Sequence, residues 1–144
     1  MNRHIEKTTM WLANIPGAAR RILSFFYLAL IALMSLLPSH TFEKVPFLFE
    51  NEDKVIHFLM YGGMAVMLCW TFPRRNRKWL IYYAAIVLIC TGFGMLMEIL
   101  QGTFPQLGRS FSWADEAANI TGTIFFIPIK ELLLTGKIDR LEQR

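Results

Sequence analysis

The side chains of this sequence that can do chemistry stand at helical spacing in three separate stretches. Residues three, four or seven positions apart share one face of a helix. Each stretch therefore predicts one polar stripe, and the stripes are Asp53, His57 and Tyr61; Gly94, Glu98 and Gln101; and Asp115, Asn119 and Gly122. Lys54 and Arg109 add cationic groups beside the stripes. An imidazole, carboxylates, amides and cations in one place could bind a polar head group or transfer protons.

Acid–base catalysis is one chemistry that these residues allow. His57, Glu98 and Asp115 are the candidate catalytic residues, because an imidazole beside a carboxylate can give and take protons. The sequence has no signature of a nucleophile–base pair, a phosphate-binding loop or a binuclear metal site, which weakens the enzyme hypothesis. The same three side chains could hold a cation such as zinc. Their positions follow no specific ligand spacing, so the sequence assigns neither a metal nor a cofactor.

Binding of an amphipathic ligand uses more of the polar residues. The cationic side chains and His57 could meet a phosphate, while the carboxylates and amides could bond to sugar or amide groups. The candidate ligand-binding residues are Asp53, Lys54, His57, Tyr61, Glu98, Gln101, Arg109, Asp115 and Asn119.

A purely structural role is the third interpretation of the same residues. Ser112 precedes Asp115 by three positions, a spacing typical of a helix N-terminus. Asn119 and Gly122 could mediate close packing between helices in lipid. Tyr61 could anchor at a membrane interface. Under this interpretation the chain is a scaffold or binds a partner protein.

The composition indicates a membrane protein. Of the 144 residues, 54% are hydrophobic and 18% are charged, whereas soluble domains carry about 25% charged residues. This hydrophobicity excludes a disordered chain. Two cysteines cannot build a disulfide scaffold or a four-cysteine zinc site.

Four apolar runs predict an all-α integral membrane bundle of four helices. A helix needs about 20 mostly apolar residues to cross a bilayer. The runs cover 22–37, 55–72, 79–102 and 114–134, and Pro128, Lys130 and Glu131 make the fourth the weakest. The chain then divides into a basic N-terminal segment (1–21), a four-span domain (22–134) and a charged tail (135–144).

Lysine and arginine positions predict the orientation. Four lie before the first run, four lie within 73–78, and four lie at or beyond the end of the fourth run, which makes twelve of the fifteen. Positive residues favour the cytoplasmic side, so both termini are predicted to be cytoplasmic and 39–54 and 103–113 to face outside. The anionic inner leaflet explains the basic excess, and no nucleic-acid partner is expected. The predicted location is the cytoplasmic membrane, with several crossings.

The polar residues and their surroundings resemble the VanZ-like membrane proteins. The matching stretches are SLLP at 35–38, DKVIHFLMY at 53–61 and GFGMLMEILQGTFPQLGRSFSWADEAANITG at 92–122. The family pattern has Asp-Lys, then His and Tyr, Glu-x-x-Gln, a loop with Pro and Arg, and Asp-x-x-x-Asn followed by Gly. The resemblance covers about 22–128. It implies a bacterial cytoplasmic-membrane protein and a link to low-level resistance to the glycopeptide teicoplanin.

Taken together, these features favour recognition at the outer leaflet. The expected ligand is an envelope lipid, a lipid-linked precursor or an amphipathic antibiotic, and membrane lipids are the expected surroundings. Catalysis on a lipid-linked substrate is the alternative, and a scaffold is the second alternative. His57 and Glu98 are expected to be neighbours, because each lies about one turn from the outer end of its helix.

Overall fold

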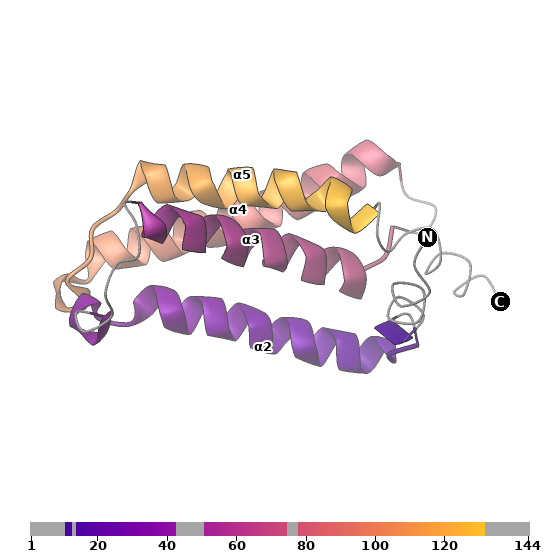
Figure 1. The fold of residues 1–144 in the computed structure, drawn as a ribbon, viewed down its shortest axis with the longest axis horizontal. Helices are drawn as coiled ribbons and strands as arrows, with labels where there is room; N and C mark the ends of the chain where they lie inside the picture. The colour runs from indigo at the N-terminus through magenta and orange to yellow at the C-terminus, as the bar shows by residue number, and fades with distance from the viewer. Residues whose placement is uncertain (1–10, 13, 43–50, 75–77, 132–144) are drawn as a thin grey trace.

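The computed structural model describes residues 11–12, 14–42, 51–74 and 78–131. Regular structure in these residues is entirely helical, in the order α2 (Gly17–Leu36), η1 (Ser39–Phe42), α3 (Glu52–Thr71), α4 (Trp79–Thr103), η2 (Pro105–Leu107) and α5 (Trp113–Lys130). The four long helices lie side by side and alternate in direction (Figure 1). The predicted all-α fold with four helices is therefore confirmed. The first ten residues of the predicted N-terminal segment and the whole predicted tail lie outside the described residues.

The first helix begins earlier than its apolar run. α2 starts directly after Pro16 and includes Arg20, which the run at 22–37 left out. Arg20 is 5% exposed. Its guanidinium donates from Nε to the Ile15 carbonyl at 2.9 Å and from NH1 to the Trp70 carbonyl at 3.4 Å. These bonds let a charged residue enter the first turn of an apolar helix.

The helix ends follow ordinary local rules. α2 stops before Pro38, and Leu37 is extended, as residues before proline usually are. At the start of α5 the Ser112 hydroxyl accepts the Asp115 N–H at 3.2 Å, which confirms the predicted cap. α5 is helical through Pro128 to Lys130.

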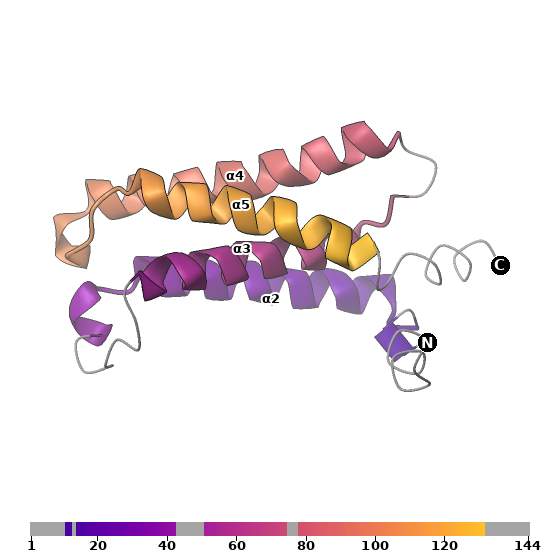
Figure 2. The same cartoon turned by 45° about the horizontal axis from the view of Figure 1, so that its top comes forward.

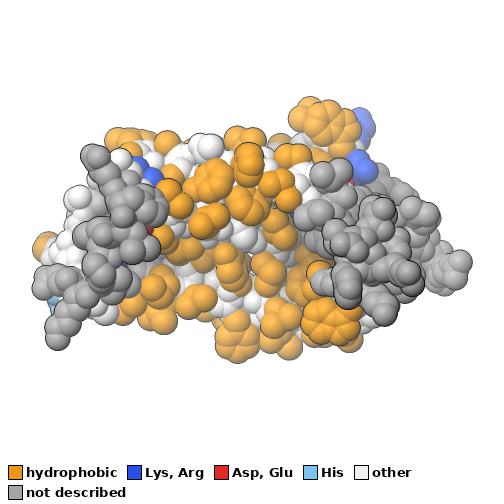
Figure 3. Space-filling view, viewed as in Figure 1, with side chains coloured by type: hydrophobic (Ala, Val, Ile, Leu, Met, Phe, Trp, Pro, Cys, Tyr) orange, Lys and Arg blue, Asp and Glu red, His pale blue; other side chains and the backbone are white. Residues whose placement is uncertain are grey.

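Three of the four helices are long and apolar enough to cross a membrane, namely α2, α3 and α4. α5 is different because Asp115, Glu116 and Lys130 fall within its 18 residues. The described part of the fourth predicted run therefore forms a helix that is less apolar and more charged than the other three. Large apolar side chains cover the middle of the face in Figure 3, with lysine or arginine toward both ends.

Small residues bring α3 and α5 close together. A Cβ atom on Gly122 would collide with the backbone carbonyl of Phe58, and one on Gly62 would collide with the ring of Phe126. The role predicted for Gly122 in helix packing is confirmed. Cys69 and Cys90 are fully buried in the core, as expected of small hydrophobic residues.

The alternation of the helices gives the bundle two distinct ends (Figures 1 and 2). The start of α2 and the end of α5 lie at one end. The starts of α3 and α5 and the end of α4 lie at the other, together with η1 and η2. The predicted polar stripes all belong to this second end, which we call the polar end.

Candidate functional site

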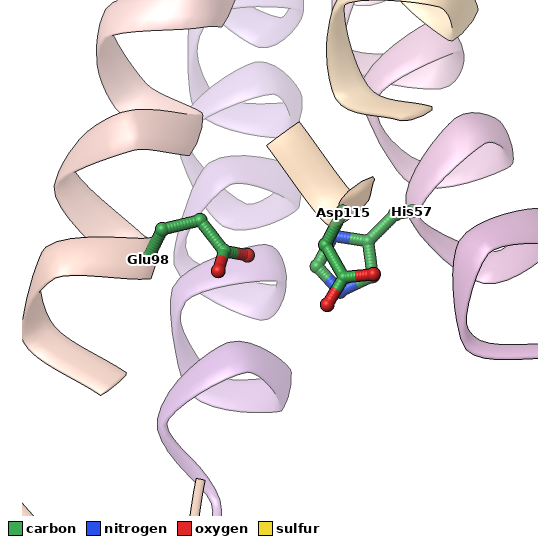
Figure 4. Close-up of side chains that lie close together, drawn as sticks. All are labelled: His57, Glu98 and Asp115. Atoms are coloured by element: carbon green, nitrogen blue, oxygen red, sulfur yellow. The ribbon is translucent and has the colours of Figure 1, made fainter. Parts of the chain in front are cut away.

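The polar end brings together three side chains from three helices (Figure 4). His57 comes from α3, Glu98 from α4 and Asp115 from α5. One ring nitrogen of His57 and one carboxylate oxygen from each acid all lie within 4.8 Å of one another. The predicted proximity of His57 and Glu98 is confirmed. All three candidate catalytic residues thus occupy one site, to which Glu116 and Asn119 also belong; we call these five residues the polar cluster.

Glu98 is the most deeply buried of the three central side chains. It is 1% exposed. Its Oε2 atom accepts the backbone N–H of Ser112 at 2.9 Å, which ties α4 to the start of α5. Its Oε1 atom is buried and has no hydrogen-bond partner. The side chain is therefore held by one oxygen, while the other remains available.

A chain of hydrogen bonds orients His57. The Asn119 amide Nδ2 donates to Glu116 Oε2 at 3.0 Å, and Asn119 Oδ1 lies 2.9 Å from His57 Nδ1. Because a carboxylate accepts only, the amide must present Oδ1 to the histidine. His57 Nδ1 therefore carries the proton and donates it to Asn119. The Nε2 atom is the ring nitrogen that Asn119 leaves open to a proton, a ligand or a metal.

Gly94 makes room for this chain of hydrogen bonds. A Cβ atom at position 94 would lie 2.6 Å from Glu116 Oε2 and 2.8 Å from Asn119 Nδ2. Any larger residue on this face of α4 would displace the amide that orients His57. Gly94 belongs to the predicted stripe of α4, and its role is to leave room for the Glu116 and Asn119 side chains.

Lys54 supplies positive charge at the edge of the polar cluster. Its ammonium lies 2.9 Å from Asp53 Oδ2 and 3.6 Å from Asp115 Oδ1. The Lys54 side chain is 36% exposed, whereas that of Asp115 is 15% exposed. Lys54 therefore bridges the start of α3 to the start of α5, with its charge partly in contact with the surroundings.

Two predicted ligand-binding residues face α2. Gln101 is buried, and its Nε2 donates to the Ser35 carbonyl at 2.7 Å. Arg109 donates from Nε to the Leu37 carbonyl at 3.0 Å. Both side chains therefore fasten the end of α2 to α4 and to the segment after it.

Tyr61 and Asp53 have different surroundings. Tyr61 is 1% exposed and stacks on His57, with ring centroids 6.4 Å apart, so it lies in the core and does not serve as an interfacial anchor. Asp53 is exposed in the first turn of α3 and contacts the polar cluster through Lys54.

Glu116 is a member of the polar cluster that the sequence analysis missed. It is 2% exposed and bonded to Asn119. Its spacing of three from Asn119 carried the signal, because residues i and i+3 share a helix face. Asp115, at a spacing of four, satisfies the same rule, and the predicted stripe includes Asp115 in place of Glu116.

The polar cluster has an excess of hydrogen-bond acceptors. Within the described residues, Glu98 Oε1 and Glu116 Oε1 are buried without a hydrogen-bond partner, and Asp115 Oδ1 has no hydrogen bond but pairs with the Lys54 ammonium at 3.6 Å. A buried carboxylate oxygen without a donor is costly. The site can therefore accept donors from hydroxyl, amide or ammonium groups, bind a cation or exchange a proton.

Comparison with known families identifies the chain. The family model for VanZ/LLP1 matches residues 7–133, a longer stretch than the 22–128 over which the motifs resemble the family. Comparisons with curated proteins and with solved structures gave no match. The match covers α2 to α5 and every residue of the polar cluster. The chain belongs to the VanZ/LLP1 family, the VanZ-like proteins.

Proposed function

We propose that this protein spans the bacterial cytoplasmic membrane several times, with both termini in the cytoplasm and the polar end at the outer leaflet. The three apolar helices and the family support a membrane location. The start of α2 and the end of α5 share one end of the bundle, as cytoplasmic termini require. Twelve of the fifteen basic residues belong to that side of the predicted topology.

The proposed function is recognition of the polar head group of an envelope lipid or lipid-linked precursor. One observation carries this proposal: Glu98 Oε1 is buried without a hydrogen-bond partner, and it lies in the same cluster as Asp115, whose Oδ1 pairs with the partly exposed Lys54. Hydroxyl and amide groups of a head group donate to such oxygens, and its phosphate pairs with the ammonium. The exposed apolar side chains of the helices suit the lipid tail.

An amphipathic glycopeptide of the teicoplanin type offers the same chemistry. Its sugars and peptide groups supply donors, and its acyl chain supplies an apolar tail. A resistance role follows if the antibiotic, or the precursor that it binds, occupies the polar cluster. Recognition of a head group would in this way lead to antibiotic resistance.

Catalysis is the second candidate, favoured by a specific observation. His57, Glu98 and Asp115 present ligand atoms within 4.8 Å of one another, and the histidine has a fixed tautomer with Nε2 free. A base oriented by a second group is a usual arrangement for proton transfer. The substrate would be the same lipid-linked molecule.

Native mass spectrometry of the purified chain with its co-extracted lipids tests the proposal. The wild type should retain a phosphate-bearing lipid, and Glu98→Gln should lose it. Glu131→Gln is the matched control, because Glu131 pairs with Lys130 at the opposite end of α5. Equal retention by wild type and Glu98→Gln contradicts head-group recognition. A lipid that only the wild type alters chemically favours catalysis.

A further inference from the structure

The three central side chains of the polar cluster are of the types that bind transition metals. Imidazole and carboxylate are established zinc ligands, and three protein ligands with one open position are typical of reactive zinc sites. The ligand atoms lie within 4.8 Å of one another. In a tetrahedral site with bonds of about 2.0–2.2 Å, ligand atoms stand about 3.3–3.6 Å apart. Rotation of the His57 and Asp115 side chains toward Glu98 would bring the ligand atoms to that spacing.

Glu98 provides an independent indication that the polar cluster can bind a cation. It is 1% exposed, its Oε1 atom has no hydrogen-bond partner, and the carboxylate points toward His57 and Asp115 (Figure 4). Its other oxygen is fixed by the Ser112 N–H. A carboxylate held in this way cannot turn its free oxygen to another donor without losing that bond. A metal ion between the three side chains would satisfy it.

The surroundings of His57 are those of a metal-bound histidine. Such residues almost always donate their second ring N–H to an oxygen acceptor, which fixes the ring and its tautomer. Asn119 is that acceptor here, and Glu116 fixes the orientation of the amide. The lone pair on Nε2 is therefore the one available to a metal ion.

We propose that His57, Glu98 and Asp115 bind one divalent first-row transition-metal ion of the zinc type. Two carboxylates and a neutral imidazole carry a charge that balances a divalent cation. The imidazole ligand disfavours Mg²⁺ and Ca²⁺, which prefer oxygen ligands alone. An oxygen of the head group would supply the fourth ligand, and this last step rests on the proposed function. The metal site itself needs only the three side chains.

Zinc titration of the full-length purified protein tests the proposal. The protein is stripped with a chelator, reloaded with Zn²⁺, and measured by competition with a chromogenic chelator and by elemental analysis. The wild type should bind one Zn²⁺ per chain, and excess Mg²⁺ should not displace it. His57→Gln and Glu98→Gln should each weaken zinc binding by at least about tenfold. Changing a residue that only hydrogen-bonds to a metal ligand already costs about tenfold, and loss of a ligand itself should cost no less.

Matched variants separate a specific site from nonspecific binding. His40→Gln removes an exposed histidine in η1, and Glu131→Gln removes a carboxylate outside the polar cluster. Both should bind zinc as the wild type does. Helicity and thermal stability are measured alongside, and Asp115→Asn, whose side chain is partly exposed, is a second ligand variant if His57→Gln does not fold. Absence of stoichiometric zinc, or equal binding by wild type and all folded ligand variants, overturns the site.

Lys54→Gln distinguishes this inference from the proposed function. Removing the ammonium near Asp115 takes away a competing cation, so zinc binding should be unchanged or tighter. Retention of the phosphate-bearing lipid should fall in the same variant. Lipid retention by a wild type that binds no zinc overturns the metal site alone. Zinc binding by a wild type that retains no such lipid overturns the proposed head group alone.

Discussion

His57 and Asn119, which are 62 positions apart, share a hydrogen bond of 2.9 Å between Nδ1 and Oδ1. The bond joins α3 to α5, and Asn119 continues it to Glu116. Gly94 on α4 leaves the space that this arrangement needs. A single amide therefore connects α3 to α5 and orients the histidine, in a space that the glycine on α4 leaves open.

Asn119→Leu should destabilise the protein. The substitution removes both side-chain bonds and leaves the Glu116 carboxylate buried without its donor, a cost of about 1–3 kcal/mol. The apparent Tm in detergent, followed by intrinsic fluorescence, should fall. Thr121→Val, an exposed change on the same helix whose hydroxyl bonds only within α5, should leave the Tm near that of the wild type. A wild-type Tm for Asn119→Leu would show that the bond chain contributes no stability.

Gly122→Ala tests the close contact between α3 and α5. The new methyl group would meet the Phe58 carbonyl, and because that atom is backbone, the helices must separate. The expected loss is about 1–3 kcal/mol, as for other overpacked cores. Gly92→Ala is the matched control, because nothing lies within 4 Å of a Cβ atom there. Equal thermal stability of the two variants would contradict the packing of these helices.

Cysteine labelling tests the orientation of the bundle. The background is Cys69→Ala with Cys90→Ala, since both cysteines are buried in the core. Gln106→Cys should react with an impermeant thiol reagent in intact cells, and Lys78→Cys only after permeabilisation. Both positions are exposed and lie at opposite ends of α4. The reverse pattern would place the polar cluster on the cytoplasmic side.

The number of helices and the residues at the polar end were predictable from the sequence. Apolar runs broken by Pro38 and Pro73 set the approximate extents of α2 and α3. Alternation of the helices then brought the stripes of α3, α4 and α5 to one end. This part follows from chain length and hydropathy, which are local properties.

The rotation of each helix about its axis was not predictable in the same way. Asp115 and Glu116 are adjacent, and each is spaced to share a face with Asn119. Only packing against α3 and α4 determines that Glu116 is almost fully buried while Asp115 stays partly exposed. Gln101 likewise shares the stripe of Glu98, but its amide reaches α2 instead. Such choices depend on neighbouring helices and leave no periodic signal.

A double-mutant cycle on His57 and Glu98 tests whether the two side chains act together. Glu98→Gln and His57→Gln should each weaken binding of a phosphate-bearing lipid. The reason is that the two side chains face each other in one site, with ligand atoms within 4.8 Å of one another. The loss of binding free energy in the double variant should be smaller than the sum of the two single losses. The difference, which is the coupling energy, should be about 0.5–3 kcal/mol, as for residues in contact. His57→Gln paired with Glu131→Gln should be additive, because Glu131 lies at the other end of α5.

The same cycle separates binding from catalysis. If the pair only binds, the dissociation constant rises in both single variants, measured by lipid retention across a concentration series. If the pair transfers protons, both variants keep their affinity and lose product formation. Additive losses in affinity, equal in size to those of the Glu131 control cycle, would contradict a functional contact. They would also remove the reason for centring the site between α3 and α4, because no other described residues bring an imidazole and a buried carboxylate from these two helices together.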